Sequence, residues 1–267
     1  MTEKTIDLID HHARVTPDSL ATIDVASNRY QTYAEMNLRV GKIAQILKDQ
    51  GVSKGDRVGF YALNTTDILD IIYGCWRIGA ISLALNYRLS AEELSYQIND
   101  SQPKTLFYDL EFNSVVQNLK ASTKVNNWID FDGLGGASTL EKLITETKPL
   151  KNIIAQNSSD QCLLMYSSGT TGKPKGVIIT HSMMFYSAVD GINLTKLTSD
   201  AVSLASMPIF HIGGLNVSCC PVIRIGGTVV VIRNFEPGLV LDIIADKDIG
   251  INQLFKVPAA YNALRMH

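Results

Sequence analysis

One short segment, residues 166–176 with the sequence YSSGTTGKPKG, carries most of the groups that could do chemistry. Its glycines let the backbone approach an anion closely and turn successive amide groups into one concavity. Its hydroxyl groups add hydrogen-bond donors, and Lys175 adds a positive charge suited to phosphate. The segment lies between two apolar runs, 161–165 and 177–180, that predict strands. The pattern favours a phosphate-binding loop, and an ordinary surface hairpin is the alternative that these residue types leave open.

The sequence of this loop excludes two better-known site types. A Walker A loop has a glycine followed at a fixed spacing by Gly-Lys-Ser/Thr, and neither Gly169 nor Gly172 is followed by that sequence. The loop also leads into a predicted strand, whereas a Walker A loop leads into a helix. The chain has no Gly-x-Ser-x-Gly elbow, which argues against a hydrolase of that kind. The loop is therefore expected to bind phosphate without being a P-loop.

A second candidate group is His211, within the sequence PIFHIGGL at 208–215. Taken alone, this histidine is equally well explained as a hydrogen-bonded residue at a corner between a strand and a loop. The four cysteines lack the spacing of metal ligands and are typical of buried thiols in a reducing compartment. We predict no metal site built by the protein alone.

Alternating helix and strand signals surround these candidates. Thr32 and Ser90 each open a capping box that is followed by apolar residues at helical spacing, and Asn64 is expected to cap a helix between them. Segment 112–159 is interpreted as connecting structure around one helix near 140–147. The predicted strands are 57–62, 80–85, 105–108, 161–165, 177–180, 201–207, 228–232 and 251–254, with further helices near 182–192 and 238–245. This alternation is typical of a largely parallel sheet.

Composition limits the class of protein. Of 267 residues, 46% are hydrophobic and 19% charged, with a net charge of −2, so a large core is expected and no nucleic-acid surface. The most apolar stretches, 68–85 and 215–232, contain charged residues, proline or glycine, so we predict no transmembrane segment. Acidic residues within the first 14 positions argue against a signal peptide. We expect a cytoplasmic, enzyme-like protein.

The sequence SSGTTGKPKG at 167–176 resembles the AMP-binding signature of the adenylate-forming superfamily, which includes acyl-CoA synthetases, beetle luciferases and peptide-synthetase adenylation domains. Further segments resemble other motifs of that superfamily: YAEMN at 33–37, GVSKGDRV at 51–58, LNYRL at 85–89, PIFHIGGL at 208–215 and VPA at 257–259. The resemblance extends over the chain from about Thr32 onward.

This resemblance implies a reaction in which Mg-ATP activates a carboxylic acid to an acyl adenylate. Pyrophosphate is released, and the acyl group then passes to the thiol of coenzyme A. ATP, Mg²⁺, coenzyme A and a small carboxylic acid are thus the implied partners. The residues implied to surround the phosphates are Ser167, Ser168, Gly169, Thr170, Thr171, Gly172 and Lys175. Thr171 and Lys175 would act in catalysis, and His211 would lie beside the acyl substrate.

Two other functions remain open on the sequence. An amino-acid adenylation domain of the peptide-synthetase type would typically carry an aspartate where His211 stands, so an uncharged substrate tail is expected instead. A non-catalytic nucleotide-binding remnant is the second alternative. The superfamily's Tyr-Gly-x-Thr-Glu segment, its ribose-binding acid and the lysine of its C-terminal domain are not found in these 267 residues. We therefore expect this chain to be inactive alone.

The resemblance also implies an α/β fold, the N-terminal part of the adenylate-forming enzyme fold, with two helix-flanked sheets in a layered sandwich. Residues 57–196 would form the first α/β subdomain, which carries the phosphate loop. Residues 1–56 and 197–267 would form a second, incomplete subdomain, and the C-terminal domain would lie outside this sequence. Because an incomplete sheet exposes apolar surface, reduced stability or self-association through it is expected.

Overall fold

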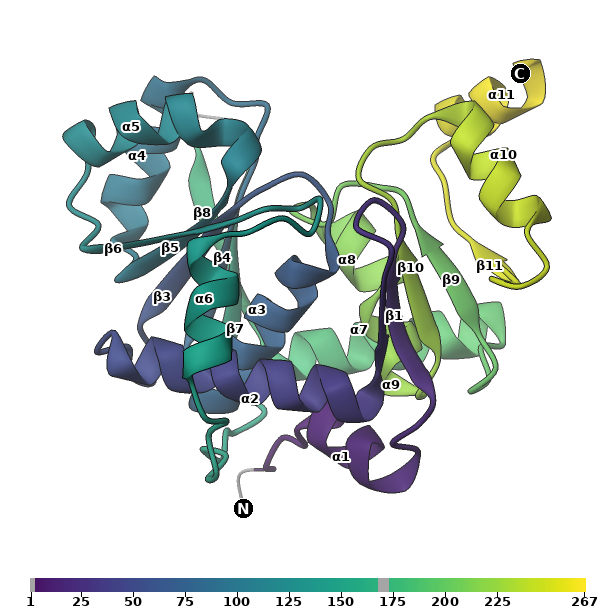
Figure 1. The fold of residues 1–267 in the computed structure, drawn as a ribbon, viewed down its shortest axis with the longest axis horizontal. Coiled ribbons are helices and arrows are strands. Elements are labelled where there is room, and N and C mark those ends of the chain that lie inside the picture. The colour runs from purple at the N-terminus through teal and green to yellow at the C-terminus, as the bar shows by residue number, and fades with distance from the viewer. Residues whose placement is uncertain (1–2, 168–172) are drawn as a thin grey trace.

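Two helix-flanked β-sheets lie side by side in the computed structural model, which describes residues 3–167 and 173–267 (Figure 1). The predicted α/β class is confirmed, and both sheets are mixed. Five of the predicted phosphate-binding residues lie outside the described residues: Ser168, Gly169, Thr170, Thr171 and Gly172.

The first sheet has six strands in the order β6-β5-β3-β4-β7-β8. All neighbours in it are parallel except β7 and β8, which form an antiparallel pair. Its strands are β3 (Arg57–Tyr61), β4 (Ile81–Leu85), β5 (Thr105–Asp109), β6 (Asn127–Phe131), β7 (Gln161–Ser167) and β8 (Lys175–Thr180). Strands β4 and β5 are buried along their whole length, as expected of parallel strands covered on both faces.

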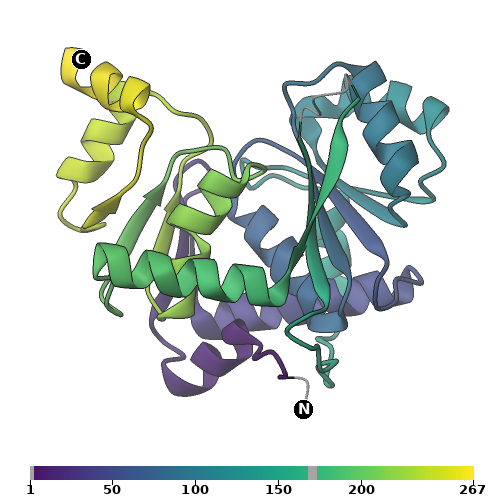
Figure 2. The same cartoon turned by 180° about the vertical axis from the view of Figure 1, so that it is seen from behind.

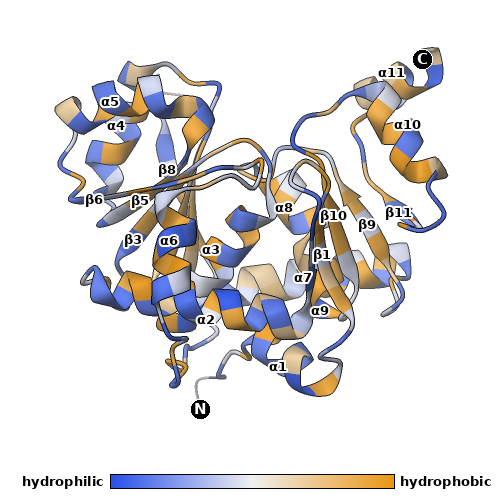
Figure 3. Cartoon of the chain, viewed as in Figure 1, coloured by the Kyte–Doolittle hydropathy of each residue, from blue (hydrophilic) through white to orange (hydrophobic). Residues whose placement is uncertain are grey.

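The second sheet has five strands in the order β11-β9-β10-β1-β2, with only β1 and β2 antiparallel. Its strands are β1 (Leu20–Asp24), β2 (Arg29–Thr32), β9 (Val202–Ala205), β10 (Thr228–Val231) and β11 (Gln253–Leu254). Apolar residues concentrate on the central strands and on the inward faces of the helices, which places the cores between the layers (Figure 3).

Helix α2 runs beneath both sheets, and α7 crosses behind the second sheet (Figures 1 and 2). The helices are α1 (Leu8–Val15), α2 (Tyr33–Asp49), α3 (Thr66–Ile78), α4 (Ala91–Ser101), α5 (Asn113–Ser122), α6 (Thr139–Glu146), α7 (His181–Thr195), α8 (Ile212–Ser218), α9 (Cys220–Arg224), α10 (Pro237–Ala245) and α11 (Pro258–Met266). Within the described residues, no helix has both the length and the apolar character needed to cross a membrane.

Both predicted capping boxes are confirmed, since Thr32 and Ser90 each exchange hydrogen bonds with the glutamate three residues later. The expected cap at Asn64 is wrong: Thr65 is the N-cap of α3 and accepts a hydrogen bond from the amide of Asp67. Segment 112–159 also holds more than the single helix expected, because α5 and β6 lie within it. Strand β6 is a half-buried edge strand, so its apolar pattern is weak.

A buried ion network joins α2 to α3 and α6. The Arg39 guanidinium lies 2.6 Å from Asp67, 2.9 Å from Asp70 and 2.5 Å from Glu141, and Arg29 lies 2.8 Å from Asp67. Burial raises the pKa of Asp70 to about 7 despite the nearby arginines. Burial acts in the same direction on Asp67, but Arg29 and Arg39 together hold the pKa of that carboxyl below its usual value. The network therefore depends on Arg39.

Candidate functional site

The two described ends of the predicted phosphate loop lie directly opposite each other. Ser167 ends β7 and Lys175 begins β8, and the two residues are cross-strand partners with exposed side chains. The hairpin therefore places this end of the loop at the carboxyl end of β7, where ligands bind in open α/β sheets. Of the predicted phosphate-binding residues, the structure brings Ser167 and Lys175 together.

Helix α4 supports the base of this hairpin. The hydroxyl of Tyr166 donates a hydrogen bond of 2.5 Å to Asp100, and the hydroxyl of Tyr96 lies 3.5 Å from the carbonyl oxygen of Pro174. Burial is the main cause that raises the pKa of Tyr166, and the hydrogen bond to Asp100 raises it further. The phenol therefore stays protonated and donates this hydrogen bond. Tyr96 and Asp100 stand four residues apart on α4, and therefore on one face of that helix. The sequence reasoning missed this support.

His211 is exposed at the start of α8, where its Nδ1 accepts a hydrogen bond of 3.1 Å from the amide of Gly213. This bond leaves Nδ1 unprotonated, so the exchangeable proton of the neutral ring is on Nε2. The neighbouring Phe210 is buried, and its ring packs edge-on against Tyr87 at 5.1 Å between centroids. A Cβ on residue 214 would lie 2.1 Å from the carbonyl oxygen of Pro208, so only glycine permits this tight turn. The site histidine is thus fixed by local backbone geometry.

Asn64 anchors the segment that leads to His211. Its Nδ2 donates a hydrogen bond of 2.9 Å to the carbonyl oxygen of Met207, and its Oδ1 accepts one of 2.8 Å from the amide of Ile209. Asn64 follows the carboxyl end of β3 in the first sheet, whereas Met207 follows β9 in the second. One buried side chain thus ties the carboxyl edges of the two sheets together. The candidate phosphate hairpin and His211 belong to this same edge of the molecule.

The comparisons agree with this arrangement. Residues 9–267 match the model of a family described as AMP-binding enzyme. The chain is 33% identical over 236 residues to a feruloyl-CoA synthase from an Amycolatopsis species, which covers 88% of this chain and 45% of that protein. It is 28% identical over 262 residues to the long-chain-fatty-acid–CoA ligase FadD13 of Mycobacterium tuberculosis, covering 97% and 50% respectively. The chain spans about half the length of the curated relatives it matches.

Solved structures show the same fold. The inhibitor-bound N-terminal domain of FACL13 from Mycobacterium tuberculosis superposes with a TM-score of 0.91 at 26% identity, over 99% of this chain and 66% of that one. ATP-bound MatB from Rhodopseudomonas palustris superposes with a TM-score of 0.85 at 25% identity, over 98% and 51%. The predicted N-terminal part of the adenylate-forming fold is confirmed. The chain belongs to the AMP-binding enzyme family.

Proposed function

We propose that this chain is the phosphate- and acid-binding part of an ATP-dependent acid–thiol ligase. The ligase would convert a carboxylic acid to an acyl adenylate and then to a coenzyme A thioester. The observation that carries the proposal is the hairpin that sets Lys175 opposite Ser167 at the carboxyl edge of the first sheet. The family match over residues 9–267 and the acyl-CoA ligases among the relatives support it.

In the proposed reaction, a carboxylate oxygen of the acid attacks the α-phosphorus of ATP, and the bond to the β-phosphate breaks. Lys175 offsets negative charge on the departing pyrophosphate, and Ser167 donates to a phosphate oxygen. The signature implies that residues 168–172, Thr171 among them, would add further hydrogen-bond donors to the phosphates. Such a reaction needs positioning and charge neutralisation more than a protein nucleophile. The thiol sulfur of coenzyme A then attacks the acyl carbon, AMP departs, and the thiol proton passes to solvent.

Magnesium would enter this site with ATP. Over residues 3–167 and 173–267, no three His, Cys, Asp or Glu side chains are grouped closely enough to hold a metal ion. In nucleotide-binding enzymes Mg²⁺ is usually held by substrate phosphate oxygens together with water and one or two carboxylates. When bound, the ion would neutralise phosphate charge, and Lys175 would supply the protein's own share of that neutralisation.

We propose an acid with an uncharged apolar tail, handled in the cytoplasm and drawn from fatty-acid or aromatic-acid metabolism. The relatives named above include a feruloyl-CoA synthase and a long-chain-fatty-acid–CoA ligase. An amino-acid substrate is less well supported, because His211 stands where an adenylation domain would typically place an aspartate. We propose that residues 57–196 form one subdomain and that residues 1–56 and 197–267 form the other. The strands of the first sheet all come from the first of these ranges, and those of the second sheet from the other two, which supports this division.

The test is carboxylate-dependent exchange of labelled pyrophosphate into ATP. We expect no exchange from the 267-residue chain alone, because the ribose-binding acid and the adenylation lysine of the family are not in it. We expect exchange from the product of the complete reading frame that contains it, with a panel of aliphatic and aromatic acids. If the complete product exchanges with none of these acids yet binds ATP, the chain is part of a nucleotide-binding remnant and the ligase proposal fails.

His211→Ala in that complete product should change acid preference. Because the imidazole is proposed to lie beside the acyl group, its loss should alter kcat/KM unevenly between a short and a long acid, by about tenfold in their ratio. The KM for ATP should stay nearly constant. The measurement is kcat/KM for two acids of different size, together with the melting temperature. A histidine that only begins α8 would instead lower Tm and leave the ratio unchanged, as its bond to Gly213 alone would predict.

A further inference from the structure

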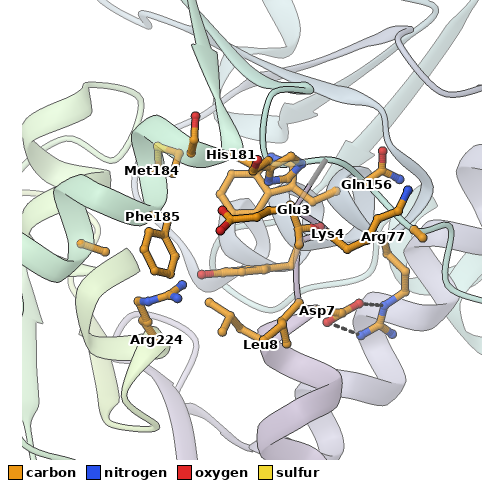
Figure 4. A pocket seen from close by; sticks show the side chains of 18 of the residues that line it. Glu3, Lys4, Asp7, Leu8, Arg77, Gln156, His181, Met184, Phe185 and Arg224 are labelled. Carbon is orange, nitrogen blue, oxygen red and sulfur yellow. Dashed lines mark hydrogen bonds and ion pairs between the residues drawn. The ribbon is translucent and has the colours of Figure 1, made fainter. Parts of the chain in front are cut away.

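A pocket of about 450 Å³ lies at the opposite end of the β7–β8 hairpin from Ser167 and Lys175 (Figure 4). It is lined by residues 3–8, by 153–156 and Ser158 before β7, and by parts of α3, α7 and α9. The length of β7, 7 residues at about 3.3 Å each, separates it from the candidate phosphate site by roughly 20 Å. The proposed reaction makes no use of this pocket.

The walls of the pocket are mainly apolar and aromatic. Tyr73 and Trp76 of α3 and Phe185 of α7 contribute rings, and Trp76 packs edge-on against His181 at 5.5 Å between centroids. Burial lowers the pKa of His181 to about 4, so this imidazole is neutral near pH 7. Such walls favour an apolar body over a nucleotide or a sugar.

One cation of the pocket wall, Arg224, lacks an ion-pair partner among the described residues. The Arg224 guanidinium lies 4.0 Å from the centre of the Phe185 ring, yet it forms no ion pair with any residue of 3–167 or 173–267. The hydroxyl of Tyr73, next to the thiol of Cys220, and the Oε1 of Gln156 are buried behind the pocket surface and do not face its interior. A cation without a counter-charge beside apolar surface marks a place where an anionic ligand would complete the pairing.

The other charged groups of the wall sharpen this contrast. Arg77 is paired with Asp7 at 2.7 Å, on the side of the pocket opposite Arg224 (Figure 4). Lys4 is bound to the side chain of Asn157 at 2.9 Å, and Glu3 is exposed. With Lys4, Arg77 and Arg224 against Glu3 and Asp7, the charge of the wall is 3 − 2 = +1. The excess positive charge resides at Arg224, beside the aromatic rings.

We propose that this pocket binds a small amphipathic carboxylate, with its carboxylate on Arg224 and its apolar body against Trp76 and Phe185. One unpaired guanidinium within mainly apolar walls matches one negative charge on an apolar ligand, and matches poorly the several charges of a phosphate ester. A volume of about 450 Å³ suits a small organic acid. The proposal is independent of the proposed ligase activity, because it concerns a different end of the molecule.

The experiment compares octanoate with octanol by isothermal titration calorimetry on the 267-residue chain. We expect saturable binding of octanoate and binding of octanol weaker by on the order of tenfold, because only octanoate carries the charge. Arg224→Leu should weaken the binding of octanoate by on the order of tenfold or more and leave the binding of octanol unchanged. Arg265→Leu, the same change at an exposed site on α11, is the matched control and should change neither.

Arg224→Lys keeps a positive charge at this position, so it guards against an Arg224→Leu variant that fails to fold. It should weaken octanoate binding several-fold and leave octanol binding unchanged, because lysine keeps the charge but lacks the two parallel donors of a guanidinium. Equal affinity for octanoate and octanol, or no saturable binding at millimolar octanoate, overturns the proposal. It is also overturned if His211→Ala abolishes octanoate binding while Arg224→Leu and Arg224→Lys leave it unchanged, because the acid then occupies the proposed acyl site.

Discussion

Arg39→Leu is expected to destabilise the chain by about 3–5 kcal/mol, the usual cost of removing one partner from a buried ion network. The arginine side chain is 10% exposed, and the substitution leaves Asp70, which is 0% exposed, without its cation at 2.9 Å. Leucine supplies similar apolar bulk, so the effect reports charge more than volume. The measurement is urea-induced unfolding followed by circular dichroism at pH 7.

Arg14→Leu is the matched control, because Arg14 pairs with Asp10 on the surface of α1 and is 73% exposed. Exposed pairs of this kind contribute about 0.3–0.5 kcal/mol. A loss at Arg39 no larger than the loss at Arg14 would show that the buried network does not stabilise the fold. Failure of Arg39→Leu to accumulate as folded protein, with Arg14→Leu normal, agrees with the expected loss.

The cost of Arg39→Leu should also depend on pH. Removing the cation raises the folded-state pKa of both Asp67 and Asp70, and that of Asp70 already stands at about 7. A carboxyl whose folded pKa exceeds the unfolded value of about 3.9 binds its proton more tightly when folded, so stability falls as pH rises. The deficit of the variant should therefore be smaller at pH 5 than at pH 8. An equal deficit at both pH values would contradict this assignment.

Local chemistry made several elements predictable from the sequence. Thr32 with Glu35 and Ser90 with Glu93 form capping boxes that require only residues three positions apart, and both are present. The hairpin at the candidate phosphate site was predictable for the same reason, since its two apolar runs flank the loop directly. Interactions between residues that are only a few positions apart produce patterns that can be recognised in the sequence.

Long-range contacts account for what the sequence did not predict. The sequence around Asn64 is typical of a helix cap. In the structure, however, its side-chain amide forms hydrogen bonds with residues 143 and 145 positions later in the chain, and these bonds replace the local cap. Strand β1 pairs with β10 through partners such as Thr22 and Val229, which no short pattern relates. The pocket beside Arg224 is assembled from segments near residues 3, 73, 153, 181 and 224. Periodicity indicates which faces are buried, but it does not indicate which distant residue lies opposite.

Lys175→Ala is expected to lower the adenylation rate of the proposed full-length ligase by on the order of 10²–10³, the usual cost of losing one positioned group that stabilises developing charge. Lys175 begins β8 opposite Ser167, so its backbone is held by the strand pairing while its exposed side chain is free to reach a phosphate. The proposed role concerns pyrophosphate, which is common to every substrate. The rate should therefore fall by one shared factor for all acids, unlike the uneven change expected of His211→Ala.

The control for this prediction is Lys173→Ala. Lys173 is also exposed and lies only two residues earlier, but it precedes β8 and is paired with none of the described residues of β7. A general loss of positive charge near the loop would affect both variants alike, whereas a positioned cation predicts a large loss only at Lys175. The deciding measurement is the single-turnover rate of adenylate formation with three acids of different size. A loss that varies with the acid, or equal losses at Lys173 and Lys175, would refute the phosphate role, because a group that neutralises pyrophosphate has no means of distinguishing one acyl tail from another.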